Sequence, residues 1–252
     1  MDKLSLWFFW FGVRKVLKTH RFDLIQAHEF VIGCDIIRLG DGLHSQWISR
    51  LATDRNFIER LLIGVSIFHS SKLYMERKAL KADRLRKVIV NSNLVKAELD
   101  DGYPHLASKT ILHRNVVGGS FFHSSNRCNV DRRYDRGANF RLLFVGSGWR
   151  RKGLNSVLEA LAKLPPRYTL SVYGDDKRSL RYAKIARRLR IQDRVVFLGI
   201  KPIDGTIYEA HDMLVLPSNY DPFPNVIAEA LASGCKVCCS GDTGGVDFAN
   251  DR

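Results

Sequence analysis

Two stretches in the second half of the sequence combine residue types that bind phosphate and hydroxyl groups. The first, residues 144–153, has the sequence FVGSGWRRKG. An apolar run leads there into a loop that opens at Gly146 and closes on three basic residues, Arg150, Arg151 and Lys152. Glycine lets a backbone approach a ligand closely, and a helix that follows such a loop favours an anion at its N-terminus. The pattern predicts a diphosphate site; the alternative is an ordinary strand-to-helix turn with solvated basic residues.

The second stretch, residues 220–234, has the sequence YDPFPNVIAEALASG and holds two carboxylates eight positions apart. Asp221 lies in a loop that two prolines stiffen, and Asn225 is placed to cap the apolar helix that follows. Glu229 then lies about one turn inside that helix. A carboxylate inside an apolar helix needs a partner. Solvent or a basic side chain could be that partner, and so could the two hydroxyls of a ribose.

A third stretch, residues 28–44, has the sequence HEFVIGCDIIRLGDGLH and follows a predicted strand. Ligand sites of α/β sheets lie just past the carboxyl ends of strands. Asp35 and Asp41 are therefore candidates for contact with a ligand. Aspartate is also a routine turn residue, so capping of the loop by both side chains is an equal alternative.

Short apolar runs alternate with helical patterns along the chain from residue 22, which predicts parallel sheets of α/β type. The predicted strands are residues 23–26, 88–90, 110–112, 142–145, 170–173, 195–198, 213–216 and 236–238. The predicted helices are residues 54–82, 153–164, 178–190 and 225–233. The polar, glycine-rich residues 118–139 interrupt this pattern and predict a linker or long loop. We therefore expect one domain over residues 1–117 and a second over residues 140–252.

The chain is basic, with 40 Lys and Arg against 26 Asp and Glu in 252 residues, a net charge of +14. This charge favours an anionic partner, which could be a phosphate-rich substrate, a membrane surface or nucleic acid. The absence of zinc-ligand spacing and of aromatic RNA-recognition motifs disfavours nucleic acid. We interpret the cysteines as reduced core thiols, which suits a cytoplasmic protein. They are Cys34, Cys128, Cys235, Cys238 and Cys239.

An apolar segment, residues 4–13 with the sequence LSLWFFWFGV, precedes a basic flank over residues 14–21. Ten residues are too few to span a bilayer. The segment also lacks the basic start and the small-residue cleavage site of a signal peptide. It is expected to be a helix that packs on a sheet. The alternative is an interfacial helix with aromatic anchors and basic residues beside them.

The motifs resemble those of glycosyltransferase family four, whose members have the GT-B fold of two Rossmann-like domains with parallel sheets. Within that family the chain is most similar to the bacterial lipopolysaccharide-core glucosyltransferases. The stretches FVGSGWRRKGL, YDPFPNVIAEALASG and GCDIIRLGDGLH carry the likeness, which runs from about residue 28 to residue 245. The chain departs from the common family pattern at two positions. It has Asp221 where Glu is more frequent, and Ser147 where an arginine often follows the first loop glycine.

The resemblance implies a role for each motif. Lys152, with Arg150 or Arg151, would bind the donor diphosphate, and Asp221 and Glu229 would bind the donor sugar and its ribose. Asp41, in the acceptor-side N-terminal domain, would face the acceptor. The full donor site implied in this way consists of Gly146, Arg150, Arg151, Lys152, Asp221, Pro222, Phe223, Asn225 and Glu229.

The function implied is transfer of a hexose, glucose in the first place, from a UDP-sugar to a lipopolysaccharide-core acceptor with retention of configuration. UDP-glucose would be a co-substrate, with no cofactor and no metal, and the sequence has no Asp-x-Asp metal motif. The expected location is the cytoplasm or the cytoplasmic face of the inner membrane, where an anionic surface would match the charge.

Two other classes of function stay open. One is an inactive GT-B fragment or pseudoenzyme that keeps the donor-binding fold, and the other, less favoured, is a basic nucleic-acid-binding module. A GT-B enzyme begins with a strand and a glycine-rich loop, which we do not find before residue 22, and ends in helices for which residue 252 leaves no room. We therefore expect the N-terminal domain and the C-terminal end to be truncated.

Overall fold

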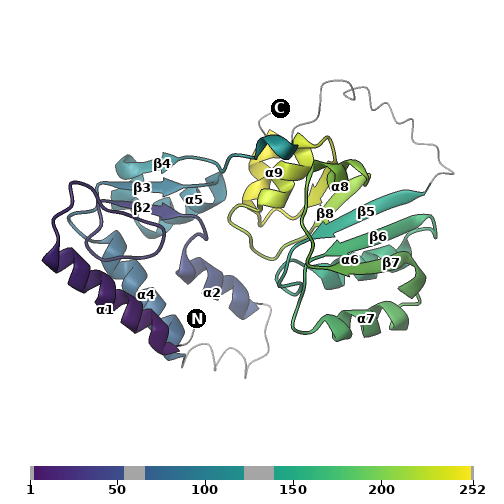
Figure 1. Cartoon of the computed structure of the whole chain (residues 1–252), viewed down its shortest axis with the longest axis horizontal. Coiled ribbons are helices and arrows are strands. Elements are labelled where there is room, and N and C mark those ends of the chain that lie inside the picture. The colour runs from purple at the N-terminus through teal and green to yellow at the C-terminus, as the bar shows by residue number, and fades with distance from the viewer. Residues whose placement is uncertain (1–2, 54–65, 122–138, 251–252) are drawn as a thin grey trace. The chain divides into compact units, whose positions relative to one another are not determined.

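The computed structural model describes residues 3–53, 66–121 and 139–250 (Figure 1). The chain divides into two compact units, Met1–Arg114 and Asn115–Arg252. Most of the predicted linker, residues 122–138 with Cys128, lies outside the described residues, as does the 54–65 part of the first predicted helix. The assignment of an acceptor-side and a donor-side domain stays a prediction.

The first unit contains a four-stranded parallel sheet in the order β1-β2-β3-β4 (Figure 1). Its strands are β1 (Gln26–Ala27), β2 (Ile36–Leu39), β3 (Lys87–Val90) and β4 (Thr110–Leu112). Its helices are α1 (Lys3–Thr19), α2 (His44–Thr53), α4 (Ile67–Leu80), α5 (Asn93–Gly102) and the 3-10 helix η1 (Pro104–Lys109).

Strand β2 was not predicted from the sequence, although the β-branched pair Ile36 and Ile37 between two glycines is a strand signal. Asp35 stands at its amino end and is buried. Its carboxylate accepts from the Ile25 amide at 2.9 Å and pairs with Arg84 at 3.1 Å and with Arg86 at 3.6 Å. The hydrogen bonds from Arg84, then the one from Ile25, hold the pKa of Asp35 below its ordinary value. Asp35 therefore ties the starts of the strands together and is structural.

Helix α1 packs on the first unit through one side only. Val13 and Leu17 pack against the core, whereas Phe8 is 70% exposed and Phe11 is 56% exposed. The expected packing on a sheet therefore accounts for part of the helix, and an aromatic face is left uncovered. Among the described residues, no helix combines the length and the apolar character needed to cross a bilayer.

The second unit contains a five-stranded sheet in the order β7-β6-β5-β8-β9, with every pairing parallel. The strands are β5 (Phe140–Val145), β6 (Tyr168–Tyr173), β7 (Val195–Gly199), β8 (Met213–Leu216) and β9 (Lys236–Cys239). The α-helices are α6 (Leu154–Lys163), α7 (Ser179–Arg188), α8 (Gly205–Glu209), α9 (Asn225–Ala232) and α10 (Asp247–Asn250). The 3-10 helices are η2 (Gly119–Phe121), η3 (Gln192–Arg194) and η4 (Gly244–Val246). The predicted α/β architecture with two parallel sheets is confirmed.

The core of the second unit is formed by the central strands and the helices that cover them. Leu143, Phe144 and Leu214 are fully buried. The prediction of core thiols is confirmed for two of the four described cysteines and is wrong for Cys238, because alternation along a strand turns some residues outward. Cys34 in the first unit and Cys235 in the second are buried, Cys239 is partly buried and Cys238, on the edge strand β9, is exposed.

The order of strands reverses between β5 and β8. From β5 the chain adds β6 and β7 on one side, and then β8 and β9 on the other. At such a switch point, the loops after two neighbouring parallel strands diverge and leave a crevice at the carboxyl edge, where α/β sheets bind ligands. The loop of residues 146–153 follows β5 and the loop of residues 217–224 follows β8. Both motifs found in the sequence therefore meet at this point.

The two loops are held together by backbone contacts. The Asn219 amide donates to the Arg151 carbonyl at 2.9 Å. Gly153 has a φ of +78°, and a Cβ on it would lie 2.1 Å from the carbonyl oxygen of Pro217. Only glycine fits this conformation and this approach, so Gly153 is required where the loops cross.

We predict that Gly153→Ala destabilises the chain more than Gly148→Ala. Gly148 has nearly the same φ, +73°, but no atom within 4 Å of an added Cβ. Both substitutions place an alanine in the left-handed backbone region, which costs about 1–2 kcal/mol of stability. Gly153→Ala adds a backbone clash of roughly 1–3 kcal/mol. The melting temperature of Gly153→Ala should therefore lie several degrees below that of Gly148→Ala, and equal melting temperatures would contradict the loop contact.

Candidate functional site

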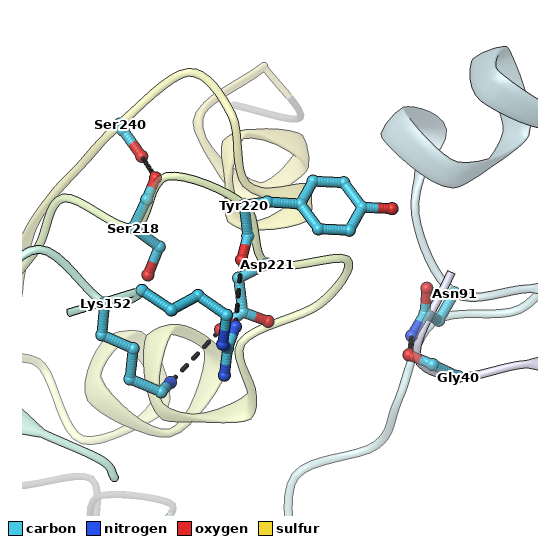
Figure 2. Close-up of polar contacts among 8 residues, drawn as sticks. Gly40, Asn91, Lys152, Ser218, Tyr220, Asp221 and Ser240 are labelled. Atoms are coloured by element: carbon cyan, nitrogen blue, oxygen red, sulfur yellow. Dashed lines mark hydrogen bonds and ion pairs between the residues drawn. The ribbon is translucent and has the colours of Figure 1, made fainter. Parts of the chain in front are cut away.

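The centre of the site is an ion-pair cluster on Asp221 (Figure 2). Its Oδ2 lies 3.2 Å from Lys152 Nζ and 3.3 Å from Arg151 Nη1. The same guanidinium nitrogen donates to the Tyr220 carbonyl at 3.0 Å. The side chains of Lys152 and Asp221 are 12% and 11% exposed, whereas that of Arg151 is 40% exposed. The fold thus brings together three of the predicted residues from loops about 70 positions apart.

Gly146 makes room for the lysine. A Cβ on Gly146 would lie 2.7 Å from both Cδ and Cε of Lys152, so the lysine side chain passes directly over the glycine. The loop is anchored by Trp149, which is buried and whose indole nitrogen donates to the Gly146 carbonyl at 2.9 Å. The glycine therefore serves to orient Lys152 towards Asp221.

Backbone contacts fix Asp221 on its other side. Asp221 forms an isolated parallel bridge with Thr243, its amide donates to the Asp242 carbonyl at 3.3 Å, and its carbonyl accepts from the Gly244 amide at 2.9 Å. Pro222 and Phe223 are buried, and Phe223 packs edge-on against Phe248 with ring centroids 5.5 Å apart. Their contacts support the loop that presents the Asp221 carboxylate.

The predicted cap of α9 is wrong. Asn225 is the first residue of the helix, the N-cap is Pro224, and no side chain caps the helix. The Asn225 Oδ1 instead accepts from the Asn115 amide side chain at 2.7 Å. Asn225 is exposed at the helix start.

Glu229 has a partner that sequence reasoning missed. Its Oε2 accepts from the Tyr208 hydroxyl at 2.6 Å. Tyr208 is completely buried, and burial first, then the hydrogen bond to Glu229, raises the pKa of its hydroxyl. The partners expected for Glu229 were solvent, a basic side chain or the two hydroxyls of a ribose. No motif pointed to this tyrosine, which lies in the short helix α8.

The two candidate arginines of the predicted diphosphate loop, residues 146–153, make different contacts in the structure. Arg151 contacts Asp221, whereas Arg150 lies on the exposed side of the loop. Ser147, at the position where the family often has arginine, accepts with its hydroxyl from the Asp175 amide at 3.2 Å. The second cation at the carboxylate is therefore Arg151.

In the first unit, Asp41 lies in an exposed turn just past β2, at the carboxyl edge of the sheet. The buried Asn91, just past β3, donates to the adjacent Gly40 carbonyl at 2.8 Å and so fixes this turn (Figure 2). His44 stacks on Trp47, and burial lowers the pKa of His44 to about 4. This histidine is therefore neutral near pH 7. Asn91 was not singled out in the sequence.

The arrangement in the second unit suits a ligand that carries both phosphate and hydroxyl groups. Two cations and the start of α6 can attract an anion, and the two carboxylates can accept from hydroxyls. Within the described ranges, no group of three His, Cys, Asp or Glu side chains is arranged to hold a metal ion.

Comparisons with known proteins show which family and which fold the chain resembles. Residues 134–251 match the family model described as Glycosyl transferases group 1. A lipopolysaccharide core biosynthesis glycosyltransferase, LpsE from Rhizobium meliloti, is 32% identical over 110 residues, which cover 44% of this chain and 32% of LpsE.

Two solved structures resemble the whole described fold. The crystal structure of WaaG, a glycosyltransferase involved in lipopolysaccharide biosynthesis, matches with a TM-score of 0.76 and 21% identity over 95% of this chain and 65% of that one. Anabaena HepE in complex with UDP and glucose matches with a TM-score of 0.65 and 20% identity over 94% of this chain and 64% of that one. The chain thus spans about a third of LpsE and just under two thirds of WaaG and HepE.

The predicted resemblance to GT-B glycosyltransferases is confirmed by the match of the second unit and by the likeness of the fold. The chain therefore has the GT-B fold, and its residues 134–251 match the Glycosyl transferases group 1 family model.

Proposed function

We propose that this protein is a retaining glycosyltransferase of family four that transfers glucose from UDP-glucose to a lipopolysaccharide-core acceptor. The observation that carries the proposal is the cluster of Lys152, Arg151 and Asp221 at the switch point of the second sheet. The lipopolysaccharide relatives support the acceptor class, and the complex of HepE with UDP and glucose supports the donor.

The cations have a clear role in this reaction. Breaking the bond between sugar and diphosphate leaves negative charge on the departing UDP. Lys152 and Arg151 stabilise that charge from fixed positions, which lowers the barrier more than solvent can. Before the donor binds, Asp221 is their counter-ion. The donor diphosphate takes over that role, and the Asp221 carboxylate then accepts hydrogen bonds from the sugar.

Two further carboxylates complete the proposed mechanism. Glu229 holds the ribose of the donor, one helical turn from the start of α9. Asp41 orients the acceptor hydroxyl or receives its proton, and the Asn91 hydrogen bond fixes the turn that carries it. No cofactor is required, because the two side-chain cations supply the charge that a metal would otherwise provide.

A calorimetric screen of UDP-, ADP- and GDP-sugars tests the donor. We expect UDP-glucose to bind most tightly and to be turned over, with release of UDP, when a lipopolysaccharide-core acceptor is added. Chelation of divalent metals should leave binding unchanged. Binding without transfer or hydrolysis would favour the inactive GT-B fragment. Failure of every nucleotide sugar to bind would contradict the proposed donor site.

We predict that Lys152→Ala weakens UDP-glucose affinity by one to two decades. The lost charge-assisted hydrogen bond to phosphate is worth roughly 1.5–3 kcal/mol. The melting temperature should change little, because Arg151 still pairs with Asp221. Lys163→Ala is the matched control. It removes an exposed lysine at the far end of α6 and should bind UDP-glucose as the wild type does.

The composition and the exposed residues of helix α1 support peripheral binding of the protein to an anionic membrane. Residues 3–22 contain no acidic side chain. Phe8 and Phe11 are exposed in the first half of the helix, and Lys15 and Lys18 are exposed in the second half. Aromatic residues with adjacent cations suit the boundary between headgroups and acyl chains. We propose that α1 binds this boundary at the cytoplasmic face of the inner membrane.

Sedimentation with lipid vesicles tests the membrane proposal. The protein should sediment with phosphatidylglycerol vesicles more than with phosphatidylcholine vesicles, and less as salt rises. Lys15→Glu with Lys18→Glu should abolish most of this binding. Lys184→Glu with Arg188→Glu makes the same charge change on the exposed face of α7 and should leave most of it. Equal loss of vesicle binding in both double variants would mean that the net charge of the protein, not α1, is responsible for the binding.

A further inference from the structure

In the second unit, the buried hydroxyl of Tyr208 donates a hydrogen bond to Glu229. The ring has no exposed surface, and the 2.6 Å hydrogen bond joins α8 to the middle of α9. A buried tyrosine hydroxyl needs a partner, so part of this contact serves the fold. The choice of partner is unusual, because the acceptor is the carboxylate assigned here to the ribose of the donor.

The tyrosine ring is held in place from several sides. Asp204 caps α8 by accepting from the Thr206 amide at 3.0 Å. Phe121 packs edge-on against the Tyr208 ring with centroids 6.0 Å apart, and the Phe121 carbonyl accepts from the Ser233 hydroxyl at 3.0 Å. The hydroxyl therefore has a fixed position, and it holds one carboxylate oxygen of Glu229.

The hydrogen-bond donor to Glu229 is a neutral hydroxyl, and its effect on the carboxylate differs from that of a cationic side chain. Burial raises the pKa of Tyr208, so the hydroxyl stays protonated and always donates. One oxygen of the Glu229 carboxylate is then occupied by a neutral hydrogen-bond donor. A lysine or arginine in the same place would neutralise the carboxylate. An ionised carboxylate is the stronger acceptor for hydroxyl donors.

We infer that Tyr208 is a positioning residue that aims the second oxygen of Glu229 at the ribose hydroxyls of the nucleotide. This inference rests on the proposed function, because it takes Glu229 as the ribose-binding carboxylate. It adds a specificity: the Tyr208–Glu229 pair makes the site prefer ribonucleotides to 2′-deoxyribonucleotides. Without the hydrogen bond from Tyr208, the glutamate side chain can rotate and the preference falls.

Calorimetric binding of UDP and of 2′-deoxyuridine 5′-diphosphate tests the proposed role of the Tyr208–Glu229 pair. We expect the wild type to bind UDP at least tenfold more tightly, since one charged hydrogen bond is worth one to two decades. Tyr208→Phe should bind UDP about tenfold more weakly and lose most of the preference for ribose. Tyr182→Phe is the matched control. It removes the hydroxyl of another buried tyrosine, on α7, and should keep both the affinity and the preference.

A second variant keeps the test valid if Tyr208→Phe folds poorly. In Glu229→Gln the side-chain carbonyl can still accept from Tyr208, so the fold should survive while the charge is lost. This variant should also lose the preference for UDP, and adding Tyr208→Phe to it should change the preference no further. Melting temperatures measured alongside show which variants are folded.

The outcomes separate this inference from the proposed function. A wild type that binds neither nucleotide overturns both. A wild type that binds both nucleotides equally overturns the inference and leaves the diphosphate site standing. A folded Tyr208→Phe variant that keeps the wild-type preference for UDP also overturns the inference and leaves the diphosphate site standing, since the tyrosine would then serve packing alone.

Discussion

The site depends on the close crossing of two backbone segments at the point where the strand order reverses. Gly153 sits against the Pro217 carbonyl without room for a side-chain atom, and the Asn219 amide is bonded to the Arg151 carbonyl. This contact sets the distance between the loops that follow β5 and β8. Lys152 can reach Asp221 only because the loops lie this close. The parallel sheet thus supplies the meeting point, and glycine makes the approach possible.

Much of this was predictable from the sequence. The strand and helix pattern predicted all five strands of the second sheet to within two residues, because their apolar runs are long and sharply bounded. The pairing of Lys152 with Asp221 follows from the two motifs once the switch point is known. The role of Asn225 did not follow, because an asparagine at a helix start fits the cap as well as the first turn. Strand β2 was missed because it has only four residues and Arg38 interrupts its apolar run.

Tyr208 shows a different limit of sequence reasoning. It lies 21 residues before Glu229, on another helix, and its type is common in cores. Only the packing of α8 against α9 identifies it as the partner of a carboxylate. Partners that come from the tertiary fold carry no local pattern, whereas a glycine that must adopt a positive φ belongs to a loop pattern that can be recognised. This is why the diphosphate loop was found and the support of the second acid was not.

The two acids of the motif are compensated in opposite ways, and the difference fits the proposed reaction. Asp221 is paired with two cations, whose charge the donor diphosphate would draw away. The carboxylate then needs new donors, and the hydroxyls of the sugar next to the diphosphate can provide them. In the proposed reaction, phosphate binding and sugar binding would therefore be coupled through one aspartate. Glu229 instead accepts a hydrogen bond from the neutral Tyr208 hydroxyl, a contact that an arriving diphosphate would not draw away. In this proposal the first acid would respond to the sugar donor, while the second would present the same carboxylate oxygen to the ribose before and after the diphosphate binds.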